Sequence, residues 1–119
     1  MFNLTDNAME GQWKEFCDGV RVKIRPVTRS TYRKIRKEAE TMVKRMKIDL
    51  DVEVDKKIYE HMIEDWEGIL DHDGNSLEAT SKNIQLVCDR AIDLAAWITE
   101  ESQRLANAVN KEEEETLKN

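Results

Sequence analysis

The stretch DWEGILDHDGNSLEAT, residues 65–80, decides the fold that we expect for this chain. Its Trp-Glu-Gly sequence predicts that a helix ends at Gly68, because glycine readily adopts the left-handed conformation that closes helices. Residues 71–74 predict a tight turn in which aspartate side chains accept hydrogen bonds from the backbone. Thr80 is a typical helix N-cap. The stretch therefore predicts a tight connection between two helices.

Apolar residues at three- and four-residue spacing predict helices on both sides of this connection. The helix before it is expected at about 55–67, with Asp55 as its N-cap and Trp66 on its apolar face. The pattern after it spans about 81–109. It predicts either one helix or two helices with a break near Asp89.

Two short β-prone sequences flank Asp18-Gly19, a dipeptide that suits a two-residue turn, and they predict a β-hairpin at 13–26. A two-residue loop would place four apolar side chains on one packing face: Trp13, Val20, Val22 and Ile24. The same register sets Lys14 opposite Lys23, which is unfavourable for like charges. A longer loop with a shifted register therefore stays open.

A further helical pattern follows Pro26. Its apolar residues predict a helix at about 29–47, which Thr28 or Ser30 would cap. The next eight residues, 48–55, alternate apolar and acidic side chains. This two-residue period is typical of strands, so we expect an edge strand or an extended linker there.

Composition favours one helix-rich domain. Of the 119 residues, 39% are apolar and 37% are charged, with one proline and four glycines. We predict an α+β fold, mainly α, in which the N-terminal hairpin packs on three to four helices within a single globular domain, 1–110. Residues 111–119 would form a charged tail, either a solvated helix end or a loose segment. Neither a membrane span nor a signal peptide is indicated, so a cytoplasmic protein is expected.

The charge is distributed unevenly along the chain. Residues 1–20 carry a net charge of −3, residues 21–47 carry +9 and residues 48–119 carry −12. A basic segment beside an acidic remainder favours association between copies, so we expect a homo-oligomer. Nucleic-acid binding through 21–47 is the alternative. We do not favour it, because no aromatic residues interleave with the cations and no known nucleic-acid-binding motif accompanies them.

No pattern in the sequence indicates catalysis. His61 lies among acidic residues but has no second ligand at helical spacing, and no phosphate loop or nucleophile elbow is present. Cys17 and Cys88 are far apart and lack CxxC spacing, which predicts two reduced thiols rather than a disulfide or a zinc site. The acidic turn places Gly74 at position four of a calcium loop instead of position six. We therefore predict no enzyme, no metal and no cofactor.

The candidate partner-binding residues lie on the last helical pattern. Ile92 and Trp97 make its apolar stripe wider than one neighbouring helix would cover. Extra core contact is one explanation. The other is that Trp97, Leu105 and Val109 contribute to a surface that meets another copy or a client protein. These three residues are our candidates for partner binding.

The order of these elements resembles the tail assembly chaperones of tailed bacteriophages, over residues 13–109. The features that carry the resemblance are the hairpin ending in Ile-Arg-Pro-Val, the basic helix, the tryptophan before Gly68, the Asp-Gly turn and the final helical pattern. The resemblance implies a non-catalytic protein of a phage or prophage. It would coat the tape measure protein, keep it soluble and present it to tail tube protein in the bacterial cytoplasm.

Two alternative functions stay open at this point. A small nucleic-acid-binding or regulatory protein would use the basic segment 21–47, and its affinity would depend strongly on salt. A structural head-tail connector subunit would form a fixed closed ring without a client. A chaperone differs from both, because it needs an apolar surface that a client helix can enter.

Overall fold

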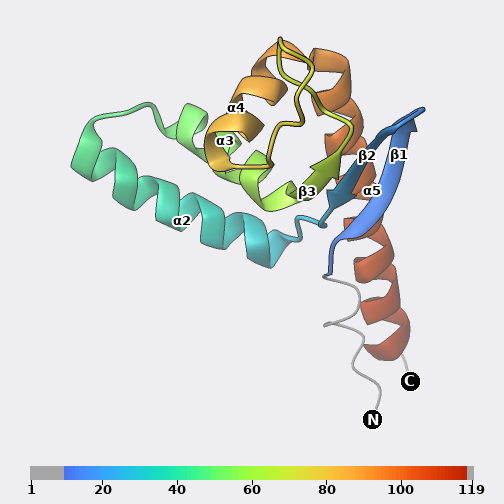
Figure 1. Cartoon of the computed structure of the whole chain (residues 1–119). Helices are drawn as coiled ribbons and strands as arrows, with labels where there is room; N and C mark the ends of the chain where they lie inside the picture. The colour runs from blue at the N-terminus through green and yellow to red at the C-terminus, as the bar shows by residue number, and fades with distance from the viewer. Residues whose placement is uncertain (1–9, 118–119) are drawn as a thin grey trace.

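The computed structural model describes residues 10–117, with side chains placed through Val109. Figure 1 shows a small antiparallel sheet with helices on one side of it. In chain order the elements are β1 (Gln12–Cys17), β2 (Val20–Ile24), α2 (Arg29–Met46), α3 (Leu50–Met62), β3 (Ile63–Glu67), α4 (Ser81–Arg90) and α5 (Ile92–Leu117). The fold is α+β and mainly α, which confirms the predicted class.

β1 and β2 form the predicted hairpin, which turns at Asp18-Gly19. Cys17 pairs with Val20, as a two-residue loop requires. A β-bulge between Glu15 and Cys17 then adds one residue to β1. Because side chains alternate along a strand, this single residue turns the rest of β1 to the opposite face. The hairpin is therefore confirmed, but the register predicted beyond Cys17 is wrong.

Trp13 shows the consequence of the bulge. It faces Lys23 instead of Ile24, so it lies on the outer face of the sheet and not on the packing face. There the Arg21 guanidinium carbon lies 5.0 Å from the centroid of the indole ring. The shifted register also separates Lys14 from Lys23, and like charges directly opposite each other would destabilise the pair.

The acidic alternating sequence forms the start of a helix. α3 begins at Leu50, so the strand or linker predicted at 48–55 is wrong, as is the cap predicted at Asp55. Asp49 caps the helix instead, because its Oδ1 accepts hydrogen bonds from the backbone N–H groups of Asp51 and Val52. A two-residue period also repeats every four residues. Every second apolar residue of such a pattern therefore lies on one helical face, and here Leu50 and Val54 do so, while Val52 between them is exposed.

The Trp-Glu-Gly sequence ends a strand and not a helix. The helix predicted at 55–67 is wrong over its last five residues, which form β3 and pair with β2. Val22 of β2 faces Trp66 of β3, and both side chains are buried. The pairing adds a third strand to the hairpin. Gly68 has the positive φ of 83° that the sequence indicated, but it closes the strand.

α2 confirms the helix predicted at about 29–47. The Thr28 hydroxyl oxygen accepts a hydrogen bond from the backbone N–H of Thr31, and Lys47 ends the helix in the left-handed conformation. Only Ile35 and Ala39 of α2 are buried. Figure 1 shows α2 extending away from the sheet as an arm that packs along α3.

The long helical pattern of the second half forms two helices. Thr80 caps α4 as predicted, by accepting a hydrogen bond from the backbone N–H of Asn83. The chain changes direction at Ala91, close to the break that we allowed near Asp89. α5 then continues through Leu117 and includes most of the predicted charged tail, while Lys118 and Asn119 lie outside the described residues.

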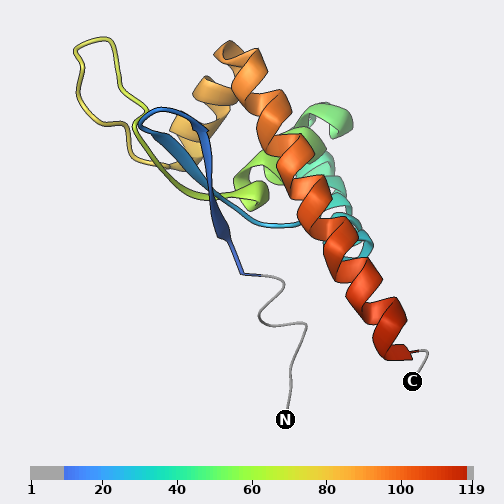
Figure 2. The ribbon, with the colours of Figure 1, turned by 90° about the vertical axis from the view of Figure 1, so that its right-hand side faces the viewer.

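The core lies where α4 and α5 cover the inner face of the sheet, and Figure 2 shows α5 running past the hairpin. Its buried cluster consists of Val22, Ile24, Met62, Ile63, Trp66, Ile84, Leu94 and Ile98. In residues 10–117 no helix is both long enough and apolar enough to span a bilayer.

Hydrogen bonds join the base of the α2 arm to the rest of the domain. The Arg25 guanidinium donates to the backbone oxygens of Glu60 and His61 at the end of α3. Ser102 of α5 donates its hydroxyl to the backbone oxygen of Arg25, at 2.8 Å. We call this set the arm junction, and it fixes the point from which α2 projects.

Candidate protein-binding surfaces

Among the residues that the structure describes, no group of three His, Cys, Asp or Glu side chains is placed to hold a metal ion. Burial raises the pKa of the Cys88 thiol to about 11, so this thiol stays protonated near neutral pH. The surface features with the clearest physical meaning are exposed apolar side chains.

The first such surface is a groove between residues 68–80, which form the β3–α4 loop, and the junction of α4 with α5. We call it the elbow groove. It encloses about 330 Å³, and its lining consists of Ile69, Leu70, Asp71, His72, Leu77, Leu86, Val87, Arg90, Ala91 and Leu94. Leu70 is 56% exposed and Leu86 is 39% exposed. Ile92, next to the lining residue Ala91, is 73% exposed. Water therefore contacts large apolar side chains on both walls of the groove.

The loop wall is held in place by hydrogen bonds. Trp66 donates its indole N–H to the backbone oxygen of Leu77, at 2.8 Å. The Asp71 carboxylate accepts hydrogen bonds from the backbone N–H groups of Asp73 and Asn75, both at 2.9 Å. This turn confirms the one predicted at residues 71–74, with Gly74 at a φ of 81°. The turn fixes the end of the loop that carries the exposed Leu70.

The helical wall owes its shape to the break at Ala91. The backbone N–H of Ala91 bonds to the oxygen of Val87, and the backbone N–H of Ala95 bonds to the oxygen of Ala91, so Ala91 joins the last turn of α4 to the first turn of α5. Directly after the bend, Ile92 is exposed beside the groove, whereas Leu94 is buried.

The second apolar surface is the connection between α2 and α3, which we call the arm tip. Three of its side chains are exposed: Met46 by 62%, Ile48 by 37% and Val52 by 66%. Val52 also borders a hollow of about 430 Å³ between α3 and α4, which we call the α3–α4 hollow. The other lining residues of this hollow are Asp55, Lys56, Tyr59, Gln85, Cys88 and Asp89.

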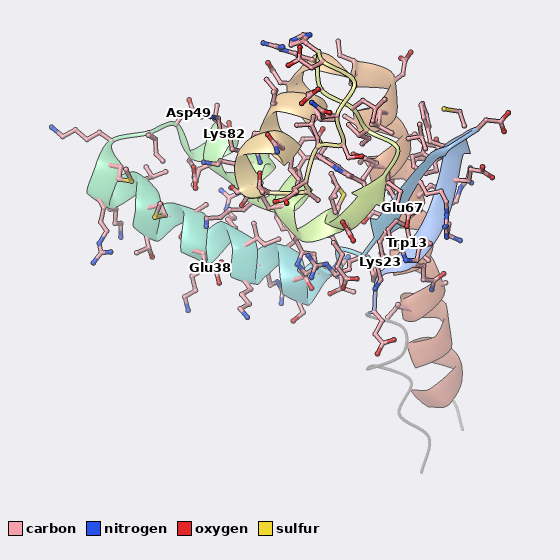
Figure 3. All side chains as sticks on the ribbon, in the orientation of Figure 1. Trp13, Lys23, Glu38, Asp49, Glu67 and Lys82 are labelled. Carbon is pink, nitrogen blue, oxygen red and sulfur yellow. The ribbon has the colours of Figure 1, made fainter. Side chains whose placement is uncertain are left out.

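The outer face of the sheet is charged instead of apolar. Lys23 forms an ion pair with Glu64 at 2.6 Å, and Arg21 forms one with Glu67 at 3.4 Å. Hydrogen bonding and charge attraction from Glu64 raise the pKa of Lys23 above its ordinary value. Figure 3 shows Lys23, Glu67 and Trp13 in the sheet region. The cations and acids of this face neutralise one another.

The three partner-binding candidates from the sequence lie against the core. Val109 is buried, and Trp97 and Leu105 are half-buried and pack against the core cluster. The ring centroid of Trp97 lies 5.1 Å from that of Phe16 in β1. The structure thus uses Trp97 to hold the hairpin on α5, and it does not bring these three side chains together on an open surface.

Sequence reasoning missed the residues of the elbow groove. Leu70 offered a signal, because it is a large apolar residue directly before an acidic turn. Ile92 offered another, since it lies outside a stripe that its neighbours already complete. The groove itself could not be predicted, because its two walls come from segments that meet only in the folded chain.

A family model described as YdaY prophage protein matches residues 18–119, which is most of the chain. The match begins in the turn of the hairpin and covers every later element. No curated protein sequence matches the chain significantly. No solved structure does so either.

Proposed function

The chain belongs to the YdaY prophage protein family, and we propose that it is a non-catalytic tail assembly chaperone. In this role it binds the tape measure protein in the cytoplasm of the bacterial host and keeps that long helical protein soluble until tail tube protein assembles around it. The prophage family and the resemblance over residues 13–109 support the biological setting. The elbow groove is the single observation that supports the mechanism.

A client helix would bind with its apolar stripe in the elbow groove. Helix-in-groove recognition places apolar side chains three or four residues apart into one apolar cleft. Leu70, Leu86 and Ile92 are all partly exposed around this cleft. Fully burying a side chain of this type contributes about 1.5–3 kcal/mol. Partial burial of three such side chains suits a client that must later be released.

The charged residues that line the groove are one acid, Asp71, and one cation, Arg90. Complementary charge at the edge of an interface mainly raises the association rate and the selectivity. These two charges would therefore orient a client helix, while the apolar side chains supply most of the affinity.

The test is co-expression with the tape measure protein of the same prophage, with the soluble fraction and co-purification of that partner as the readouts. We expect the unmodified chain to keep the partner soluble and to co-purify with it. Leu70→Asp and Ile92→Asp should each remove most of this effect, because the first places a charge in the groove lining and the second places one directly beside it. Tyr32→Asp is the matched control, since Tyr32 is a similarly exposed apolar side chain on α2 that lies outside the groove.

Two outcomes would count against the proposal. A partner that is equally insoluble with and without the chain would exclude the chaperone function. A soluble complex that survives both groove substitutions would exclude the elbow groove as the binding site. The circular dichroism spectra of the variants must match that of the unmodified chain, which we expect because both side chains are exposed.

Nucleic-acid binding is the second candidate function, and the exposure of the α2 arm is the observation that favours it. The cations on its open side are Arg29, Arg33, Lys34, Arg36, Lys37, Lys44 and Arg45, and all are exposed. Phosphate contacts by such a face would make affinity fall steeply with salt. Titration of labelled duplex DNA and single-stranded RNA at two salt concentrations separates the candidates, because the chaperone requires no such affinity.

A further inference from the structure

The arm tip combines exposed apolar side chains with charges of both signs. Met46, Ile48 and Val52 are all solvent-exposed, although they lie at the end of one helix and the start of the next. The arm tip is well separated from the sheet, and Figure 1 shows it at the far end of α2. Apolar side chains gathered on a protruding turn are typical of an interaction surface.

The charges around the arm tip are unevenly distributed. Lys44, Arg45 and Lys47 stand on the α2 side, and all three are exposed. On the other side, the α3–α4 hollow is lined by two exposed acids, Asp55 and Asp89, and by one exposed cation, Lys56. In the described residues none of these six side chains takes part in an ion pair within the chain. Both sets of charge therefore face solvent.

We propose that the arm tip binds a second copy of this chain across a two-fold axis. In this dimer, the basic end of α2 from each copy lies over the α3–α4 hollow of the other. Met46 enters the partner's hollow beside Val52, and Lys44 and Arg45 approach the partner's Asp55 and Asp89. Because the cations and the acids belong to one surface, a two-fold axis brings the cations of each copy to the acids of the other at the same time.

The shape of the α3–α4 hollow fits the Met46 side chain of a second copy. It encloses about 430 Å³, and the half-buried side chains of Tyr59 and Cys88 contribute to its lining. A hydrogen bond from the Gln85 side chain to the backbone oxygen of Lys56 joins α4 to α3 across the hollow, so its walls are fixed. An unbranched and flexible methionine side chain is well suited to an irregular hollow of this kind.

This dimer uses a different surface from the elbow groove, so it does not depend on the proposed client. The arm tip and the hollow involve α2, α3 and one side of α4, whereas the groove involves the β3–α4 loop, the opposite side of α4 and the start of α5. A dimer formed through the arm tips would leave both grooves open. It would thereby present two client sites at a fixed separation, and two linked sites hold a long client more tightly than one.

The experiment measures the mass of the purified full chain by light scattering and analytical ultracentrifugation over a range of concentrations. We expect a reversible monomer–dimer equilibrium. Met46→Asp and Val52→Asp should each weaken it by at least about tenfold, because each introduces a charge into a buried apolar contact. Leu70→Asp, at an equally exposed position in the elbow groove, is the matched control and should leave the dimer intact.

A charge exchange tests the two-fold arrangement directly. One double variant carries Lys44→Glu with Arg45→Glu, and the other carries Asp55→Lys with Asp89→Lys. Each alone should be monomeric, since like charges then face each other in the homodimer. Mixed in equal amounts, they should form a heterodimer, because every reversed cation then meets a reversed acid. A chain that is monomeric at all concentrations would overturn the proposal, as would a dimer unaffected by these changes or a mixture that fails to associate.

Discussion

The sheet–α5 body and the α2 arm differ in how much of their apolar surface is buried. In the body, Val22, Ile24 and Ile98 are completely buried, and five elements contribute to one cluster. The arm buries only Ile35 and Ala39 of its helix, and it packs mainly against α3. The body therefore holds most of the folding free energy, and the arm depends on its attachment to the body.

The same difference separates the residues that stabilise the fold from the exposed residues that are proposed to bind partners. The elbow groove and the arm tip both lie at the periphery, where large apolar side chains remain exposed and contribute little to the core. Substitutions there should change association without unfolding the chain. Substitutions in the body should instead lower the free energy of unfolding. The four predictions below test these differences in stability, beginning with the largest expected effect.

Removing an apolar side chain should cost much more in the body than in the arm. Ile98→Ala leaves a cavity between α5 and the sheet, and we expect a loss of about 3–5 kcal/mol in the free energy of unfolding. Ile35→Ala in α2 should cost about 1–3 kcal/mol, because the arm can relax around the smaller side chain. Urea denaturation followed by circular dichroism measures both. Equal losses would show that arm and body are equally well packed.

Gly68 and Gly74 offer a matched pair of glycines with nearly the same φ, 83° and 81°. A methyl group at Gly68 would collide with the backbone oxygen of Gly19 in the hairpin turn, whereas one at Gly74 meets open space. Gly74→Ala should cost about 1 kcal/mol from its left-handed backbone alone. Gly68→Ala should cost about 2–4 kcal/mol, because β3 must also move away from the hairpin. Thermal unfolding of both variants measures the difference.

Trp66 connects the body to the elbow groove through its indole hydrogen bond to Leu77. Trp66→Phe removes this donor and leaves the backbone oxygen of Leu77 without it, at a cost of about 1–2 kcal/mol. The loop wall of the groove should also become more mobile, so hydrogen exchange should accelerate in residues 69–77. If the change lowers stability but leaves exchange in the loop unaltered, then the turn at Asp71 alone fixes that wall.

The arm junction should weaken in mildly acidic solution because of His61. Its Nε2 atom is buried without a hydrogen-bond partner. Burial lowers the pKa of His61 below 6.5, the positive charges of Arg25 and Lys34 lower it further, and the backbone of Pro26 acts in the opposite direction. The unfolded chain therefore takes up this proton first. The contribution of His61 to stability is complete above pH 6.5 and decreases as the pH falls toward the folded-state pKa.

Unfolding measured between about pH 8 and about pH 5 tests this effect, since histidine is the side chain that normally titrates in that range. His61→Gln should flatten the pH dependence, while His72→Gln, at an exposed position in the loop, serves as the control. A wild-type chain whose stability does not change across this range would contradict the assignment to His61.

Some elements could be predicted because their determinants are adjacent in the sequence. The hairpin turn at Asp18-Gly19, the helix that Thr28 caps and the turn held by Asp71 all depend on residues a few positions apart. The break between α4 and α5 was also foreseen as one of two possibilities. Local patterns were therefore sufficient to predict these elements.

Other elements were mispredicted because two periods fit the same residues. The spacing of residues 63–67 allows one more helical turn, but Trp66 becomes buried only when the segment pairs with β2. Conversely, the alternating residues 48–55 suggest a strand, although Asp49 caps a helix there. In both cases the choice between helix and strand depends on whether a neighbouring strand is available for pairing. The residues of that strand lie elsewhere in the chain.

Composition and local spacing are sufficient to predict a helix-rich fold with an N-terminal hairpin, a basic helix and separated charge. The third strand, the outward position of Trp13 and the exposure of Leu70, Ile92 and Met46 could not be predicted in this way. Each of these depends on long-range packing, in which β2 supplies a pairing edge and the chain bends at Ala91. Burial is a property of the folded chain, so the exposed apolar surfaces can be identified only in the tertiary structure.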